Sequence, residues 1–581
     1  MIQTIYTNRM KTIIRTMTIA ALLISAVQLQ AQKTKKVQFV GGARSLMNAN
    51  GLTVQDTTAD TTTVKRKNGG YALLDLGVNI RPNKNTEIMG MFRIRNEYGG
   101  FWGAGVSFDV RQLWIKGIIA NAVRYQLGDI NIKQSKFTLY NHHADQIDSL
   151  PLIFQQQNAI IGYDKFYMNN NTWRMQGAHA DFGLSFAKII KEINISGFMT
   201  RLNPTDFGSV NDRLMNGLSM QIIQSKSFSA QFNRSRIFDL KGTVTTPNIF
   251  SNAVNTVELS YHKMFRSKIY KLSAELGNSR YTHSELPGYP VMKDYFINAN
   301  AQFNMPFKHF TAMLDYMNVG PDFRSLGAQS KDINYDLPSA MYSRIGNGQQ
   351  LRSIGLMDVI ANDNLYNRTI STNLISESQM YNNILPYGLA TFNRQGVLAK
   401  VMYNNKKLVQ LTAEVDALSE IRGQGSDALK QFMQIKAYAG LPVHQWLSLK
   451  RRLLVQLAWQ SQSTSRDAAA SVENVDLKSN RLSAGIRWEF SPNFELMGGF
   501  VSQTTKGTDF MPDRNTFTEV VYFNQGNYDI QQQVSAIGIR YNFSSRTYIS
   551  ALWQSSMFKN ASNKVVDYTM NQAGIIYSIA F

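Results

Sequence analysis

Two neighbouring histidines with an aspartate and a serine nearby come closest, in this sequence, to a catalytic or metal-binding cluster. They are His142, His143, Asp145 and Ser149, in a polar stretch from about 128 to 171. Imidazole and carboxylate groups bind zinc, and Ser, His and Asp together can form a hydrolase. Adjacent residues of an extended chain point in opposite directions, so the two histidines are poorly placed to share one ion. We therefore expect no enzyme, no metal and no cofactor, and keep His142, His143 and Asp145 as the candidate metal ligands.

Arginines form a second group, because they recur on one face of strand-like segments. If the apolar face of residues 72–80 contacts lipid, this group lies on the inward face with several carboxylates, including Asp75, Glu97 and Glu489. Two interpretations stay open: mutual ion pairing inside a filled lumen, or a basic wall that attracts anions in a water-filled channel. The predicted lumen-facing basic residues are Arg93, Arg95, Arg111, Arg124, Arg487 and Arg540.

The composition excludes several classes of protein. The chain has 581 residues, no cysteine and a formal net charge of +21, which rules out disulfides, thiolate metal sites and cysteine nucleophiles. A mean hydropathy of −0.25 is too polar for a bundle of membrane helices, but fits a membrane β-barrel, in which only alternate residues face lipid. Nucleic acid is not an expected partner, because the sequence has no cluster of aromatic and basic residues of the kind that reads it.

The first 31 residues have the pattern of a secretory signal peptide. Three basic residues, Arg9, Lys11 and Arg15, precede an apolar run at 17–27, and Ala31 supplies a small residue for cleavage. The run is too short to span a bilayer. We predict export with cleavage after Ala31, a signal at 1–31 and a single barrel domain at 32–581, with Met1 or Met10 as the start.

Strict alternation of apolar and polar residues fills the rest of the chain. Leu74, Leu76 and Val78 occupy every second position, and the pattern resumes with Phe92 and Ile94 after a tight turn near 84. A period of two residues predicts strands with one apolar face. Comparable hairpins surround turns near 307, 405 and 492.

Tight turns alternate along the chain with longer polar stretches. This arrangement predicts an all-β fold: an antiparallel, up-and-down transmembrane β-barrel with short periplasmic turns and long extracellular loops. With a first strand from Val37 to Arg44 and a final strand ending at Phe581, the count is about 22 strands. The ten turns lie near 84, 119, 189, 226, 267, 307, 405, 443, 492 and 544.

The last strand alternates Ala573, Ile575, Tyr577 and Ile579 and finishes in the aromatic residue Phe581. In this ending and in its architecture the sequence resembles Gram-negative outer-membrane β-barrel proteins, without pointing to a particular family. The resemblance implies that the terminal Phe581 is recognised by the barrel-assembly machinery. It also implies a location in the outer membrane, in contact with its lipid.

A long stretch from about 318 to 394 carries more apolar residues than a solvated loop needs, among them Leu337, Met341 and Leu356. A barrel of about 22 strands would otherwise enclose a wide hole. We predict that much of this loop folds into or across the lumen, and the alternative is a cap that packs on other surface loops.

These patterns favour a channel or passive transporter for small polar solutes, anions among them. The alternative is a structural barrel whose long loops dock a secretion, adhesion or surface-assembly partner from the cell envelope. The two hypotheses differ in whether the lumen is open, and the fold alone does not decide between them.

Overall fold

The computed structural model describes residues 36–56, 61–98, 106–142, 150–161, 171–205, 207–208, 211–242, 249–283, 291–329, 383–514, 520–562 and 567–581. The predicted signal peptide at 1–31 lies outside these ranges, as do His143, Asp145 and Ser149.

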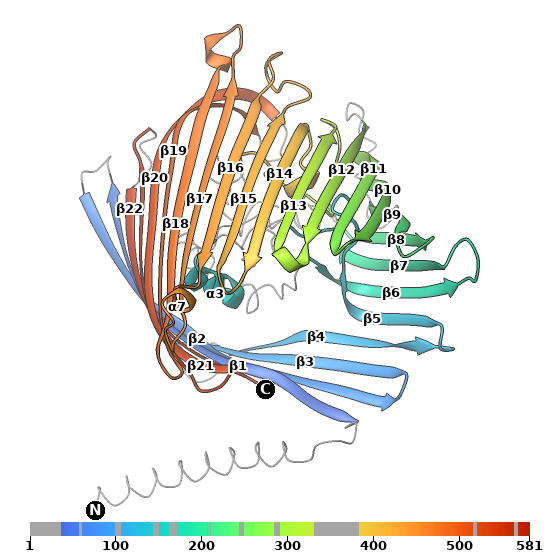
Figure 1. Ribbon diagram of the computed structural model, residues 1–581, viewed down its shortest axis with the longest axis horizontal. Helices are drawn as coiled ribbons and strands as arrows, with labels where there is room; N and C mark the ends of the chain where they lie inside the picture. The colour runs from blue at the N-terminus through green and yellow to red at the C-terminus, as the bar shows by residue number, and fades with distance from the viewer. Residues whose placement is uncertain are drawn as a thin grey trace, which may run out of the picture.

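The described chain forms a single antiparallel sheet of 22 strands that closes on itself (Figure 1). Each strand pairs with its neighbour in sequence, and β22 pairs with β1, for example Ile576 opposite Leu46. The strands are β1 (Val37–Asp56), β2 (Thr61–Asn83), β3 (Thr86–Glu97), β4 (Val106–Ile119), β5 (Val123–Ile132), β6 (Trp173–Ser185), β7 (Glu192–Asn203), β8 (Arg213–Ile223), β9 (Phe228–Asp239), β10 (Phe250–Phe265), β11 (Lys268–His283), β12 (Met292–Met305), β13 (Phe310–Val319), β14 (Arg394–Asn405), β15 (Val409–Ser419), β16 (Gln431–Leu441), β17 (Leu453–Arg466), β18 (Val475–Ser491), β19 (Phe494–Arg514), β20 (Val520–Asn542), β21 (Thr547–Asn560) and β22 (Asp567–Ala580).

The predicted strand number and topology are confirmed. Each of the ten predicted turns lies at, or within one residue of, a connection between consecutive strands, including the pair around 226, which is β8 and β9. The first strand begins at Val37 as predicted. A closed, even-numbered antiparallel sheet is the architecture of an outer-membrane β-barrel.

Alternation along the strands separates an apolar outer surface from a polar interior. Leu74 and Leu76 are exposed on the outside, whereas Asp75 between them is buried on the inside. The pattern persists at the other end of the chain, where Ile537 and Ile539 are exposed and Gly538 faces inward toward α3 (Leu152–Ile161). The predicted register of the lipid-facing residues therefore holds along the barrel.

Few helices accompany the sheet in the described residues. They are α3, α7 (Val443–Trp446) and the short 3-10 segments η3 (Pro306–Lys308), η5 (Gly388–Ala390) and η6 (Ser471–Glu473). Among the described residues, no helix is long and apolar enough to cross a membrane. Figure 1 shows α3 beside the strands of the sheet, inside the curve that they form.

Candidate functional site: the lumen and its two walls

The inner wall of the N-terminal strands carries a buried network of charges. Nε and Nη2 of Arg93 donate to the two carboxylate oxygens of Asp75 at 2.6 and 2.7 Å, and Nη1 of Arg111 donates to Oδ2 at 2.8 Å. Arg111 is the extra residue of a β-bulge in β4, and its side chain is buried on the inward face. Arg174 extends the network by donating to the Arg111 carbonyl and pairing with Asp129 at 3.0 Å. The Arg93–Asp75 and Arg174–Asp129 contacts link neighbouring strands, whereas the Arg111–Asp75 contact joins β4 to β2 across β3.

Two other predicted arginines also have carboxylate partners. Nη2 of Arg95 lies 2.6 Å from Glu97, and Nη2 of Arg124 lies 2.5 Å from Asp181. The Arg124 side chain is 73% exposed, so solvent screens its pair, and the cation can also contact a solute.

The last two predicted arginines lie on the C-terminal strands. Nη2 of Arg487 pairs with Glu495 at 2.6 Å. Nε of Arg540 donates to Asn542 at 2.9 Å, and its guanidinium lies 3.6 Å from the ring centre of Tyr548. Five of the six predicted arginines are thus paired with carboxylates, which reduces the field that this set can exert on a passing anion.

The inner wall of β16–β21 is different, since amides and hydroxyls replace most charges. Nε2 atoms of Gln460 and Gln462 donate to Oε1 of Gln434 at 3.0 and 2.7 Å. Ser479 and Thr505 share a hydrogen bond of 2.9 Å. We call this surface the amide wall, and its buried members are Gln434, Gln456, Gln462, Thr464, Ser479, Ser483, Gln503, Thr505, Gln532, Gln554 and Ser556. Sequence reasoning missed it, although glutamines at inward positions of consecutive strands were the available signal.

The connection between β5 and β6 enters the lumen and contacts both sides of the barrel. Near its start, the Phe137 ring stacks on Phe296 of β12 with a centroid distance of 4.0 Å. Gln134 donates to the Leu218 carbonyl of β8 at 3.1 Å and to the Ser219 hydroxyl at 3.0 Å. Because side chains such as Phe296 are fully buried on the inner face, this part of the connection packs inside the barrel.

Further along, the same connection forms α3, which packs on the amide wall. Ile153 and Phe154 lie in one apolar cluster with Met497, Val501 and Val534 of β19 and β20. The Leu152 amide donates to Gln456 at 2.9 Å, and Gln157 donates to Gln554 at 3.1 Å. Since β8–β12 and β17–β21 are far apart around the barrel, residues 133–142 and 150–161 pack on distant parts of the inner wall and narrow the lumen. The apolar run Leu150-Pro151-Leu152-Ile153-Phe154 within a polar stretch was the sequence signal for this insertion.

The described ends of the long connection between β13 and β14 also pack inside. Phe323, Ala328, Ile384 and Ala390 belong to a buried cluster on the inner wall, and the Ser325 hydroxyl donates to the Phe137 carbonyl at 2.6 Å. The two inserted connections therefore contact each other. Residues 330–382, which carry most of the predicted lumen-filling loop, lie outside the described residues, so that prediction is not tested.

Of the predicted metal ligands, the structure places His142. Its ring is buried against Gly388, which belongs to the connection between β13 and β14. The ring also makes an edge contact with Tyr140, at 5.0 Å between ring centres. In the part of the chain that the structure describes, no three His, Asp or Glu side chains come together as metal ligands.

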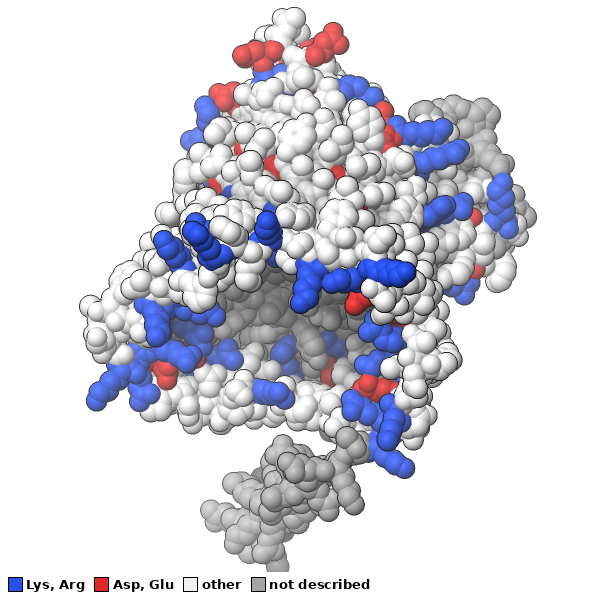
Figure 2. All heavy atoms as spheres, turned by 45° about the vertical axis from the view of Figure 1, so that its right-hand side comes forward, with Lys and Arg blue, Asp and Glu red and all other residues white. Residues whose placement is uncertain are grey.

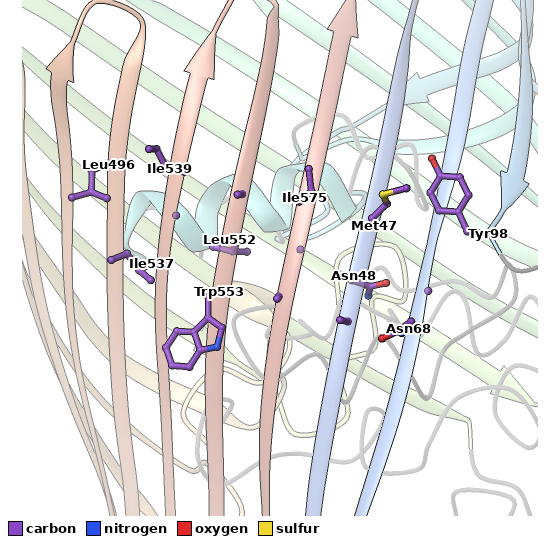
Figure 3. A pocket seen from close by; sticks show the side chains of 16 residues that line it. Met47, Asn48, Asn68, Tyr98, Leu496, Ile537, Ile539, Leu552, Trp553 and Ile575 are labelled. Carbon is purple, nitrogen blue, oxygen red and sulfur yellow. The ribbon is translucent and has the colours of Figure 1, made fainter. Parts of the chain in front are cut away.

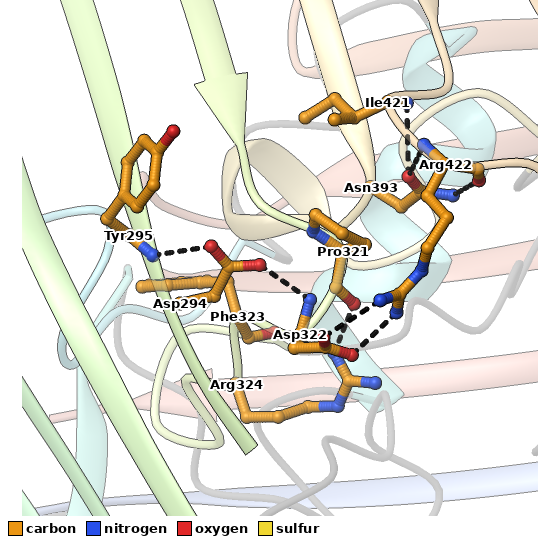
Figure 4. Close-up of polar contacts among 9 residues, drawn as sticks. All are labelled: Asp294, Tyr295, Pro321, Asp322, Phe323, Arg324, Asn393, Ile421 and Arg422. Atoms are coloured by element: carbon orange, nitrogen blue, oxygen red, sulfur yellow. Dashed lines mark hydrogen bonds and ion pairs between the residues drawn. The ribbon is translucent and has the colours of Figure 1, made fainter.

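Hydrogen bonds and an ion pair connect several chain segments at the end of the barrel opposite the ten short turns (Figure 4). Oδ2 of Asp294 accepts from the Asp322 amide at 2.8 Å, and both Asp322 carboxylate oxygens accept from Arg422, at 2.6 and 3.0 Å. Asn393 accepts from the Arg422 amide at 2.9 Å. Hydrogen bonds and the charge of Arg422 lower the pKa of Asp322, and burial raises the pKa of the neighbouring Glu420.

A hollow of about 770 Å³ lies at the opposite end of the barrel, on the inward side of β2–β6. Lys36, Arg81, Lys84, Lys116 and Arg124 line it, together with the two acids Glu87 and Asp181. Figure 2 looks toward this end and shows a recess whose edge carries many lysine and arginine side chains. The hollow is therefore a basic entrance to the lumen.

A second groove, of about 820 Å³, opens on the outside of the barrel (Figure 3). Met47, Ile537, Trp553 and Ile575 line it, and all four belong to the exposed apolar surface. Figure 3 shows α3 behind these strands, on their lumen side. The groove faces away from the lumen, so it is not part of a conduit.

Comparisons with known proteins add a fold-level likeness. No protein-family model and no curated protein sequence matches the chain. Among solved structures, Pseudomonas aeruginosa OccK11 (OpdR) is 7% identical over 94% of this chain and 96% of its own, with a TM-score of 0.34. A BenF-like porin from Pseudomonas fluorescens Pf-5 is 7% identical over 93% and 99%, also at 0.34. A loop L8 deletion mutant of OmpT, an outer membrane protein of Vibrio cholerae, is 9% identical over 94% and 99%, at 0.25. Likenesses of this degree carry no argument about function, which has to come from the lumen itself.

Proposed function

We propose that this protein is an outer-membrane channel that admits small polar solutes, anions in particular, through a lumen narrowed by residues 133–142 and 150–161. The observation that carries the proposal is the basic entrance, where five Lys or Arg side chains face two carboxylates around a hollow of about 770 Å³. A cavity lined by one excess sign of charge raises the local concentration of counter-ions.

The interior beyond the entrance supports the same function. Amides and hydroxyls of the amide wall offer both donors and acceptors, which can replace part of the hydration shell of a polar solute. Ion pairs such as Arg93–Asp75 keep the facing wall polar with little net charge. Such a lining suits solutes that carry hydroxyl, amide or carboxylate groups, whereas apolar solutes would find few contacts.

Single-channel recording of the purified protein in a planar bilayer tests the proposal. We expect discrete conductance steps and a reversal potential, in a potassium chloride gradient, that indicates a preference for chloride. Replacing Lys84 and Lys116 by Gln should lower that preference, because both side chains line the entrance. Replacing Lys478 and Lys506, which lie near the other end of the barrel, should leave it unchanged.

The outcome also addresses the alternative role. If the folded, heat-modifiable protein inserts into the bilayer but remains silent, conduction is excluded. A structural barrel that docks another cell-envelope protein through its loops then becomes the better explanation. An unchanged preference for chloride in the Lys84/Lys116 variant would instead show that the entrance does not select ions.

A further inference from the structure

The ten turns at the entrance end of the barrel carry charge of one sign. They contain twelve Lys or Arg residues and no Asp or Glu. We call these residues the basic turn rim: Lys84, Lys188, Lys191, Lys226, Arg266, Lys308, Lys406, Lys407, Lys450, Arg451, Arg452 and Arg546.

This charge is exposed and largely uncompensated. Eleven of the twelve residues are exposed, and Arg451 is half-buried. Within the described residues, Arg451 is the member of the rim with a carboxylate partner, Glu489 at 3.6 Å. At the opposite end of the barrel, in contrast, exposed arginines such as Arg201 and Arg422 pair with aspartates at 2.6 Å. Among the described residues, the opposite end therefore carries both signs of charge, whereas the ten turns carry one.

Exposed apolar side chains share the same turns. Phe307 is 82% exposed, Ile189 80% and Leu447 63%. Aromatic rings follow one another from β19 through β20 into the β20–β21 turn, with centroid distances of 4.6 Å for Phe494–Tyr541 and 4.8 Å for Tyr541–Phe543. Aromatic residues of this kind mark the level of the membrane interface in transmembrane barrels.

We propose that the basic turn rim binds the headgroups of anionic phospholipids in the adjoining leaflet. Lysine and arginine side chains reach the phosphate groups, while the apolar side chains of the same turns enter the boundary with the acyl chains. The rim favours lipid over a protein partner because its cations run from the β2–β3 turn to the β20–β21 turn, around the barrel. A protein partner would cover about 800 Å² on one side. The inference needs a barrel in a membrane and does not depend on conduction.

Native mass spectrometry of the full chain tests this proposal. The protein is released from nanodiscs that contain equal amounts of phosphatidylglycerol and phosphatidylcholine, and the retained lipids are counted. We expect phosphatidylglycerol to be enriched about fivefold at low salt, the effect of about one cation per headgroup. The enrichment should fall toward one when Lys188, Lys191, Lys406 and Lys407 are replaced by Gln.

A matched variant replaces four exposed lysines at or near the opposite end, Lys241, Lys293, Lys478 and Lys506, and should keep the enrichment. Raising the salt concentration should reduce the preference of the wild-type chain, a measurement that needs no variant. Equal retention of both lipids by the wild-type chain would overturn the proposal, even if an acidic protein were found to bind the rim. An equal loss in both quadruple variants would also overturn it, because net charge alone would then explain the effect.

Discussion

The two inner walls of the barrel reach polarity by different means. On β2–β6, buried carboxylates hold arginines in pairs, as Asp75 holds Arg93 and Arg111. On β16–β21, neutral amides and hydroxyls bond to one another, as Gln462 bonds to Gln434. On the first wall, each buried charge needs a partner of opposite charge. The neutral groups of the second wall can exchange hydrogen-bond partners with α3 or with a solute at little cost in free energy. The inserted helix accordingly lies on the second wall.

The largest effect is expected from removing one buried carboxylate of the inner wall of β2–β6. Asp75→Ala leaves Arg93 and Arg111 buried without this partner, and we expect a loss of about 3–5 kcal/mol in the free energy of unfolding. Gln554→Ala, which removes an equally buried amide from the other wall, should cost about 1 kcal/mol. Urea titration of the folded protein in lipid vesicles measures both. Equal losses would show that the walls do not differ in the way we infer.

The next effect concerns the attachment of α3 to the amide wall. Phe154 is fully buried in the cluster with Met497 and Val534, so Phe154→Ala should weaken this attachment by about 3 kcal/mol. If α3 narrows the lumen, the single-channel conductance of Phe154→Ala should be higher than that of the wild-type chain and should fluctuate more. Phe108→Ala, on the lipid-facing surface, is the matched control and should leave conductance unchanged. An unchanged conductance in a correctly folded Phe154 variant would place the narrowest point elsewhere.

The strands and their turns could be predicted from sequence because their determinants are local. Alternation at 72–80 and 88–94 with one tight turn between them fixes the register that brings Asp75 opposite Arg93. The bulge at Arg111 leaves a mark in the alternation, since the outward apolar positions step from Val110 to Leu113, but we did not predict a bulge from it. Contacts such as Leu152 with Gln456 join residues 304 positions apart, and no local pattern indicates which wall an inserted segment will meet. The alternation placed the arginines and several carboxylates on one face, but it could not indicate which arginine pairs with which carboxylate.

A smaller effect should come from the contact between the two inserted connections. Gly388 has φ of +74°, and a Cβ at this position would meet the His142 ring. Gly388→Ala should therefore cost about 1–3 kcal/mol and loosen the second insertion. Gly242→Ala is a matched control, since Gly242 has φ of +80° with open space around it. A urea midpoint that shifts equally in both variants would attribute the effect to backbone strain rather than to the His142 contact.

The smallest effect concerns the ion pair between Asp322 and Arg422, which differs from both walls in its exposure. The arginine side chain is 60% exposed and the aspartate 34%, so solvent screening limits the contribution to less than about 1 kcal/mol at pH 7. Hydrogen bonds and the charge of Arg422 lower the pKa of Asp322, so this stability is fully present above about pH 4 and is lost as the pH falls through the lowered value. Urea titrations of the wild-type chain and of Arg422→Gln should differ slightly at pH 7, and the difference should shrink as the pH falls below about 4 and the carboxyl of Asp322 becomes protonated. Lys293→Gln, at the same end of the barrel, should show no such convergence. A difference between wild type and Arg422→Gln that does not change as the pH is lowered would mean that Arg422 acts through its packing on the loop and not through the charge of Asp322.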